Sequence, residues 1–195
     1  MQEASLKNPG TLMVALGAEV VAIEKVLTPF QEQGMRLWIA NLNCPGQVVI
    51  AGEKAAFHVV EPVLKASGVK KLLPLDVSGA FHSPLMKSAE EKLKPFIEKA
   101  PIHSSSIRFL SNVSGDFTEN PLQIKDNLVR QVTSPTKWQK EIEAMDNAGV
   151  ELFIEIGPGK TLSGMNRKIG PKAPTVSIDK LADFSQLEEM MVRAS

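Results

Sequence analysis

The sequence contains one cysteine, Cys44, and no tyrosine, and its 22 basic side chains are balanced by 22 acidic ones. A lone cysteine excludes an intrachain disulfide framework and a zinc site built from several cysteines, and it is typical of a reducing compartment. Balanced charge provides no general attraction to nucleic acid or to an anionic membrane surface. We therefore expect a cytoplasmic protein with no nucleic-acid or membrane partner.

Long apolar runs are also lacking. The most apolar segment near the start, residues 12–23, is interrupted by Gly17 and Glu19, and residues 1–7 carry no basic stretch that leads into an apolar one. These features predict neither a membrane span nor a secretory signal. Hydrophobic residues make up 43% of the chain and charged residues 23%, which is the composition of a globular protein with a sizeable core.

Two sequence motifs of catalysis and binding are missing. No serine lies in a Gly-x-Ser-x-Gly nucleophile elbow, so a serine hydrolase or acyltransferase would be incomplete in this chain. Residues 155–161 resemble the end of a phosphate-binding loop, but Ile154 stands where that motif requires a glycine. We reject a nucleotide site and expect a strand-to-helix turn, whose backbone N–H groups could still meet an anion.

Up to Leu75 the chain alternates short apolar runs with segments of helical period. The pattern predicts the order strand, helix, strand, strand, helix, strand at residues 12–16, 20–33, 37–42, 47–51, 53–67 and 70–75. Gly34 and Gly68 end the two helices. This β-α-β-β-α-β order is the split βαβ pattern and predicts a ferredoxin-like small subdomain over residues 11–75.

Residues 76–195 show a different pattern, in which predicted helices alternate with isolated strands. We expect helices near 84–100, 122–132, 136–148, from the glycine-rich turn to about 168, and 181–192, with strands at 107–112, 152–156 and 175–178. Strands separated by helices predict a parallel sheet of the α/β class. So few strands would leave that sheet without partners, and we expect the chain to be a fragment.

A histidine, His82, lies in residues 76–86, where a loop meets a predicted helix that Pro84 opens. Loops that follow strands often carry the catalytic groups of α/β enzymes. By spacing alone, a helix-capping or surface histidine is favoured over a catalytic one. His58, on a predicted helix face, and His103, beside a serine run, are interpreted as structural only.

A tight turn joins the second and third predicted strands. Pro45 and Gly46 have the geometry of such a turn, and Asn41 and Asn43 precede it. By itself this pattern indicates a hairpin with capping asparagines. Cys44 has no histidine or cation beside it in the sequence, so a structural thiol is favoured over a reactive one.

Taken together, these segments resemble the bacterial malonyl-CoA:acyl-carrier-protein transacylases of fatty-acid synthesis. Four runs carry the resemblance, in the same order as in the family. Residues 41–52 resemble the pattern Asn-x-Asn-x-Pro-Gly-Gln-x-Val-Ile-Ala-Gly, and residues 77–86 resemble the family's histidine loop. Residues 128–131, followed by Pro135 and Trp138, match a further segment, and residues 155–162 match the turn Glu-x-Gly-Pro-Gly-x-x-Leu. The resemblance covers nearly the whole chain. It implies a ferredoxin-like subdomain inserted in an α/β-hydrolase-like acyltransferase domain, with residues 76–195 as the C-terminal portion of the large subdomain.

The resemblance also implies a function. Family members transfer a malonyl group from coenzyme A to the phosphopantetheine thiol of acyl carrier protein through an acyl-serine, with no metal or redox cofactor. His82 would be the general base, and the backbone carbonyl of Gln131 would orient its imidazole. Asn43 and Phe81 would contact the substrate, and phenylalanine before the histidine goes with malonyl rather than α-methyl-branched acyl groups.

The resemblance further implies an N-terminal segment that this sequence does not contain. That segment would hold a Gly-His-Ser-x-Gly elbow, an arginine for the malonyl carboxylate and a glutamine-containing oxyanion loop, and Met1 would match an interior methionine of the family. We therefore expect no malonyl transfer by this chain alone. One alternative is a non-catalytic remnant or ferredoxin-like binding module derived from an acyltransferase. A polyketide-synthase acyltransferase domain is disfavoured because no linker follows the terminal helix.

Overall fold

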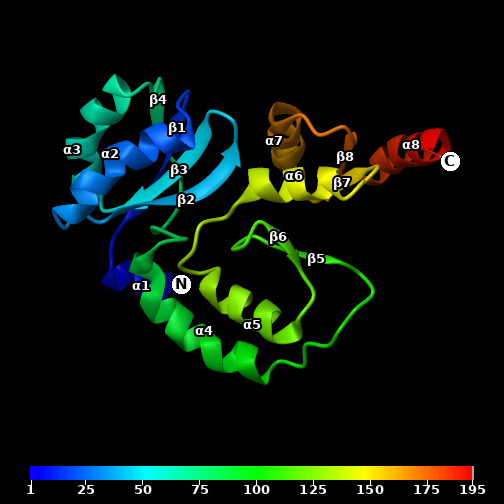
Figure 1. Ribbon diagram of the computed structural model, residues 1–195, viewed down its shortest axis with the longest axis horizontal. Helices are drawn as coiled ribbons and strands as arrows, with labels where there is room; N and C mark the ends of the chain where they lie inside the picture. The colour runs from blue at the N-terminus through cyan, green and yellow to red at the C-terminus, as the bar shows by residue number, and fades with distance from the viewer. Residues whose placement is uncertain (195) are drawn as a thin grey trace.

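A four-stranded antiparallel sheet organises the first part of the molecule (Figure 1). The computed structural model describes residues 1–194. Its strands are β1 (Thr11–Leu16), β2 (Leu37–Cys44), β3 (Gln47–Gly52) and β4 (Lys71–Pro74), and they lie in the order β2-β3-β1-β4. Helices α2 (Val20–Glu32) and α3 (Lys54–Ala66) alternate with them along the chain. The predicted order of these six elements is confirmed, with small differences at their ends.

The central strand β3 is buried on both faces of the sheet. Val48 and Ile50 belong to a core that includes Ile23 and Leu27 of α2 and the apolar side of α3. Val49 and the residue after Ile50 belong to a second core on the opposite face. Because successive side chains of a strand point to opposite faces, this division shows that the sheet is covered on both sides.

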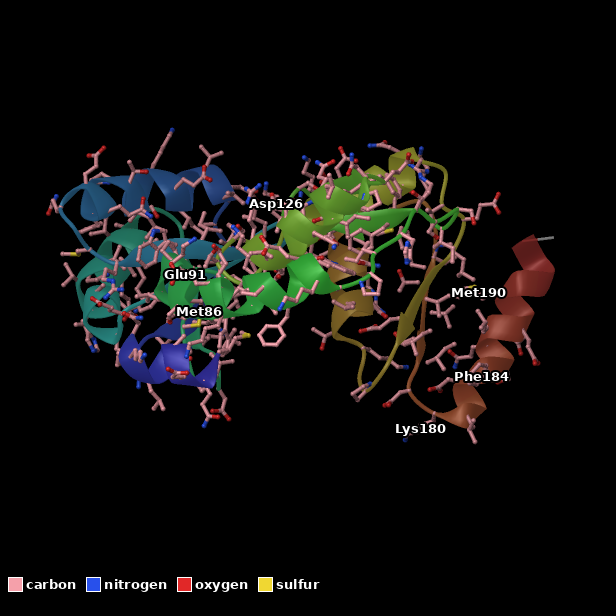
Figure 2. All side chains as sticks on the ribbon, turned by 90° about the horizontal axis from the view of Figure 1, so that it is seen from below. Met86, Glu91, Asp126, Lys180, Phe184 and Met190 are labelled. Atoms are coloured by element: carbon pink, nitrogen blue, oxygen red, sulfur yellow. The ribbon has the colours of Figure 1, made fainter. Side chains whose placement is uncertain are left out.

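The second face of the sheet is covered by the segment around His82. The 3₁₀ helix η1 (Pro84–Met86) contributes Leu85 and Met86, both fully buried, and α4 (Lys87–Lys99) follows it. The helix predicted for residues 84–100 is therefore a 3₁₀ turn continued by an α-helix. A short helix that the sequence analysis missed, α1 (Gln2–Lys7), packs against η1 and α4, and Figure 2 shows Met86 beside it.

The second part of the described chain is mainly helical and holds two small sheets. Its further elements are β5 (Phe109–Ser111), β6 (Asp116–Thr118), α5 (Pro121–Arg130), α6 (Trp138–Asn147), β7 (Phe153–Ile156), α7 (Thr161–Ile169), β8 (Thr175–Ile178), η2 (Leu181–Asp183) and α8 (Phe184–Ala194). Strands β7 and β8 pair in parallel, as predicted. The α/β class is thus confirmed.

The strand predicted at residues 107–112 differs from the structure. It is shortened to β5, which forms an antiparallel hairpin with β6 instead of a parallel pairing. Gly115 lies in the connecting turn with a φ of +65°, a conformation that favours glycine. Strand β6 was not predicted because its three residues are too few for a strand period to appear.

The link between α5 and α6 runs along the free edge of β2. The N–H of Thr136 donates to the Ala40 carbonyl at 2.9 Å, and the N–H of Leu42 donates to the Thr136 carbonyl at 2.8 Å. Thr136 was predicted to begin a helix, but it is extended and forms a parallel bridge with Asn41. This bridge joins the four-stranded sheet to the helical part of the chain. Within residues 1–194, no helix has the length and apolar character needed to cross a membrane.

Helix α6 buries a carboxyl group. Glu141 is only 4% exposed, and its Oε1 atom has no hydrogen-bond partner among the described residues. Burial disfavours the charged form and raises the pKa of Glu141 from 4.5 to about 7.

We expect Glu141 to make the folded protein less stable as the pH rises. The folded pKa lies above the unfolded one, so the destabilisation begins near pH 4.5, grows until about pH 7 and then stays constant. This pKa difference corresponds to about 3 kcal/mol. Glu141→Gln should remove the loss, measured by urea unfolding at about pH 5 and about pH 8. The exposed neighbour Glu143, changed to Gln, is the control; equal pH dependence in wild type and Glu141→Gln would contradict the assignment.

Candidate functional site

His82 follows β4 and has a left-handed backbone conformation. Its φ is +56°, and among residues 1–194 it is the one non-glycine residue with a positive φ. The next residue, Ser83, is fully buried; its Oγ donates to the Ala80 carbonyl at 2.6 Å and accepts from the Leu85 N–H at 3.3 Å. A strained backbone persists only where its surroundings hold it, and such residues cluster at functional sites. The conformation of the loop thus determines the direction in which the His82 side chain points.

The imidazole is oriented by a backbone carbonyl. Nδ1 of His82 lies 3.0 Å from the carbonyl oxygen of Gln131, which can only accept a hydrogen bond. The contact therefore requires the proton on Nδ1 and leaves Nε2 of the neutral ring with a free lone pair. The Gln131 side-chain Nε2 lies 3.3 Å from Nδ1, but it cannot donate to a protonated Nδ1. It donates instead to Thr136 Oγ1 at 3.2 Å.

The Gln131 carbonyl is free for the histidine because of its place at a helix end. Gln131 is the C-cap of α5, so its carbonyl is among the last four of the helix, which have no intrahelical partner; only a helix that continued would offer it the N–H of residue 135. Residue 135 is proline, which has no N–H. The sequence of this segment therefore leaves one carbonyl unsatisfied at the position where His82 approaches.

His82 lies in a cleft of about 460 Å³ between the two parts of the chain. The other lining residues come from α2, β2, η1 and the link after α5: Glu24, Leu27, Thr28, Gln31, Trp38, Ile39, Pro84, Thr133 and Pro135. The cleft can admit a small group to the imidazole. Over residues 1–194 we find no group of three or more His, Cys, Asp and Glu residues that could hold a metal ion.

The remaining predicted site residues lie elsewhere. Phe81 is partly buried and packs against the core on the second face of the sheet, and it is absent from the lining of the cleft. Asn43 is buried near the end of β2 and does not line the cleft either. Cys44 is a free, buried thiol whose pKa is raised by burial. The structure thus brings together His82 and Gln131, while Phe81 and Asn43 remain outside the cleft.

Sequence reasoning missed one carboxylate near the site. Glu90 on α4 is 8% exposed and accepts hydrogen bonds from Lys87 Nζ and from Thr133 Oγ1. Burial alone would raise the pKa of Glu90, but the hydrogen bonds from Lys87 and Thr133 outweigh it and hold the pKa below its ordinary value. Nothing in the local sequence indicates that Glu90 and Thr133 meet, because they are 43 positions apart.

A second carboxylate occupies the glycine-rich turn. Glu155 accepts the N–H groups of Leu162 and Ser163, at 2.8 and 3.0 Å, and the hydroxyl of Ser177 at 2.9 Å. Burial opposes the charge, but hydrogen bonds from Ser163, Leu162 and Ser177 lower the pKa of Glu155 to about 2. The N–H groups that we expected could meet an anion are therefore bound by the chain's own Glu155, which acts as a cap of α7.

Comparison with curated proteins finds clear relatives. The chain is 38% identical over 178 residues to the malonyl CoA-acyl carrier protein transacylase of Bacillus subtilis, which covers 91% of this chain and 56% of that protein. The enzyme of the same name from Haemophilus influenzae is 36% identical over 192 residues, 98% of this chain and 61% of that protein. No protein-family model matches the chain. The chain thus spans less than two thirds of the length of these relatives.

Solved structures give the same result. The chain superposes on a malonyl-CoA:acyl-carrier-protein transacylase (MCAT) from Streptococcus pneumoniae with a TM-score of 0.89 and 34% identity, over 97% of this chain and 61% of that one. A malonyl-transacylase in complex with a type II polyketide acyl-carrier protein matches with a TM-score of 0.88 and 33% identity, over 96% of this chain and 61% of that one. The chain is therefore a homologue of the malonyl CoA-acyl carrier protein transacylases and corresponds to the C-terminal part of these longer proteins.

Proposed function

We propose that this chain is the histidine-bearing part of a malonyl-CoA:acyl-carrier-protein transacylase and that His82 is its general base. The observation that carries the proposal is the 3.0 Å contact between Nδ1 of His82 and the Gln131 carbonyl, because it leaves Nε2 free to accept a proton. A carbonyl fixes the tautomer as the aspartate of a triad does, but without a full negative charge, so it stabilises the imidazolium less.

The proposed reaction passes through an acyl-serine. Nε2 of His82 takes the proton of a serine hydroxyl, the serine oxygen attacks the malonyl thioester carbonyl, and the imidazolium returns the proton to the departing coenzyme A thiolate. The phosphopantetheine thiol of acyl carrier protein then loses its proton to His82 and attacks the ester carbonyl, and the imidazolium returns the proton to the departing serine oxygen, which restores the serine hydroxyl and neutral His82. Proton and acyl transfer require no metal or redox cofactor. The serine must come from outside this sequence, in the N-terminal segment that the family resemblance implies.

We also propose that residues 11–75 form a ferredoxin-like subdomain and that residues 76–195 belong to an α/β-hydrolase-like acyltransferase domain. The antiparallel order β2-β3-β1-β4 and the two helices α2 and α3 support the first assignment. The parallel pair β7 and β8, flanked by helices, supports the second. The presence of a single cysteine, Cys44, supports a cytoplasmic location.

The catalytic assignment can be tested in a fusion that joins the unmatched N-terminal segment of the Bacillus subtilis relative to this chain. We expect His82→Ala to lower transfer of radiolabelled malonyl to holo acyl carrier protein by at least about a hundredfold, since a general base is lost. Gln131→Ala should have a much smaller effect because the backbone carbonyl remains. His58→Ala, on the exposed side of α3, is the control.

The chain without that segment should form no malonyl adduct and transfer no malonyl group. A stoichiometric malonyl adduct on a serine of this chain would contradict the proposal. If the fusion folds but stays inactive while the chain alone binds holo acyl carrier protein, the alternative of a non-catalytic binding module is supported instead.

We propose, from the family resemblance, that Phe81, the residue before His82, selects malonyl over methylmalonyl groups, although in this chain its ring packs against the second core and does not line the cleft. A rigid ring that leaves no room for an added methyl group gives a preference of about ten- to a hundredfold, from an overpacking cost of about 1–3 kcal/mol. In the fusion, Phe81→Ser should therefore bring the ratio of kcat/KM for the two coenzyme A esters towards parity. Phe96→Ser, at a phenylalanine that is 74% exposed, is the control. An unchanged ratio in a folded, active Phe81→Ser variant would mean that Phe81 has only a packing role.

The two-part division predicts unequal resistance to proteolysis. The first part encloses its own core, whereas the second exposes large apolar side chains, among them Ile156 at 82% and Leu122 at 75%. We expect limited trypsin digestion of the chain to leave a resistant fragment derived from residues 11–75, and light scattering to show association through the second part. Greater protection of residues 76–194 in a monomer would contradict this division.

A further inference from the structure

We infer that Glu90 is a positioning residue for His82: its carboxylate holds Thr133, and with it the turn whose Gln131 carbonyl fixes the imidazole. The inference rests on the proposed role of His82 as the base. It concerns a side chain that does not touch the imidazole and acts through the two segments that carry the histidine and its acceptor.

His82 and Glu90 belong to one continuous stretch of chain. The loop after His82 leads directly into η1 and α4, and Leu85 and Met86 anchor this stretch with fully buried side chains. Figure 2 labels Met86 and Glu91 on this stretch and Asp126 on the neighbouring α5. Helices α4 and α5 pack against each other. The position of Glu90 relative to His82 is therefore set by short, well-anchored secondary structure.

Gln131 and Thr133 belong to the second segment, the turn after α5. The Gln131 N–H still bonds to the Asn127 carbonyl at 2.8 Å, and the far end of the segment is held on β2 through Thr136. Between these two points, Thr133 gives the turn a side-chain hydrogen bond to Glu90 of α4, and Val132 packs against the core that contains Leu85 and Met86. The same two segments are thus joined by two hydrogen bonds, His82 to Gln131 and Thr133 to Glu90. Thr133 also lines the His82 cleft.

The hydrogen bond between Thr133 and Glu90 is favoured by the surroundings of the Glu90 carboxylate. A buried carboxylate is costly unless it is hydrogen-bonded, and both oxygens of Glu90 have partners, Lys87 on Oε1 and Thr133 on Oε2. The pKa of Glu90 lies below its ordinary value, so the group remains ionised at neutral pH and is a strong acceptor for the Thr133 hydroxyl. Lys87 is largely exposed and lies on the same helix as Glu90, so it does not connect the two segments.

The test is the tautomer of His82 in the chain itself, read by long-range ¹H–¹⁵N NMR well above the ordinary histidine pKa of about 6.5. The chain has three histidines, and single His→Gln variants assign their signals. In the wild type we expect His82 to be in the Nδ1–H form. Glu90→Ala and Thr133→Val should each convert this single form into a mixture containing the Nε2–H tautomer, because the carbonyl is no longer held against the ring.

Conservative variants separate positioning from a general loss of structure. Thr133→Ser keeps the hydroxyl and Glu90→Gln keeps an acceptor, so both should retain the Nδ1–H form. Glu91→Ala, at the exposed neighbour of Glu90, should have no effect. The double variant Glu90→Ala/Thr133→Val should match the single ones, since both substitutions remove the same link. A cooperative urea transition like that of the wild type shows that a variant is folded.

The outcomes also distinguish this inference from the proposed function. If wild-type His82 is not in the Nδ1–H form, the contact with Gln131 is wrong and the proposed role of His82 fails with it. If the wild type has that form and Thr133→Val, folded, keeps it unchanged, only the role of Glu90 is overturned. Thr133→Val leaves Glu90 bonded to Lys87, so it tests the link even if Glu90→Ala does not fold.

Discussion

The hydrogen bond between His82 Nδ1 and the Gln131 carbonyl is the interaction on which the site depends. It requires a carbonyl without an intrahelical partner, and the end of α5 followed by Pro135 leaves one. It also requires that this carbonyl be held in place from outside the helix. Thr136 holds the segment in place by its hydrogen bonds to the edge of β2. The four-stranded sheet therefore helps to orient His82, although none of its residues is a hydrogen-bond partner of the imidazole.

The sheet has this role because β3 is buried on both of its faces. Successive residues of this strand belong alternately to the core on one side and the core on the other. The loop that carries His82 packs on the second core through Ala80 and Leu85. The same sheet offers its β2 edge to the turn after α5. Two segments that are 49 residues apart in sequence therefore meet over a common rigid support. This arrangement explains why a histidine on a loop can have a fixed orientation.

Local patterns predicted the parts of the fold that local physics determines. Periodicity placed the six elements before Leu75 and the strands β7 and β8, because burial of one face requires a regular spacing of apolar residues. Elements of only a few residues, such as α1 with six and β6 with three, are too short for a repeated spacing of apolar residues to be recognised. The bond between Glu90 and Thr133 and the positive φ of His82 arise from tertiary packing, and neither has a signal in the residues around it. The resemblance to a family singled out His82 and Gln131, which spacing alone did not.

Close packing around the His82 loop explains why Gly79 and Gly10 are glycines, although neither has a positive φ. A Cβ on Gly79 would lie 2.2 Å from Ser5 Oγ, and a Cβ on Gly10 would lie 2.7 Å from the Cβ of Ala80. Both distances are shorter than any side chain tolerates, so larger residues there would displace the loop. The first contact comes from α1, which periodicity did not detect. The support of His82 therefore includes a helix near the start of the chain as well as the sheet, and the left-handed backbone at His82 is held from both sides.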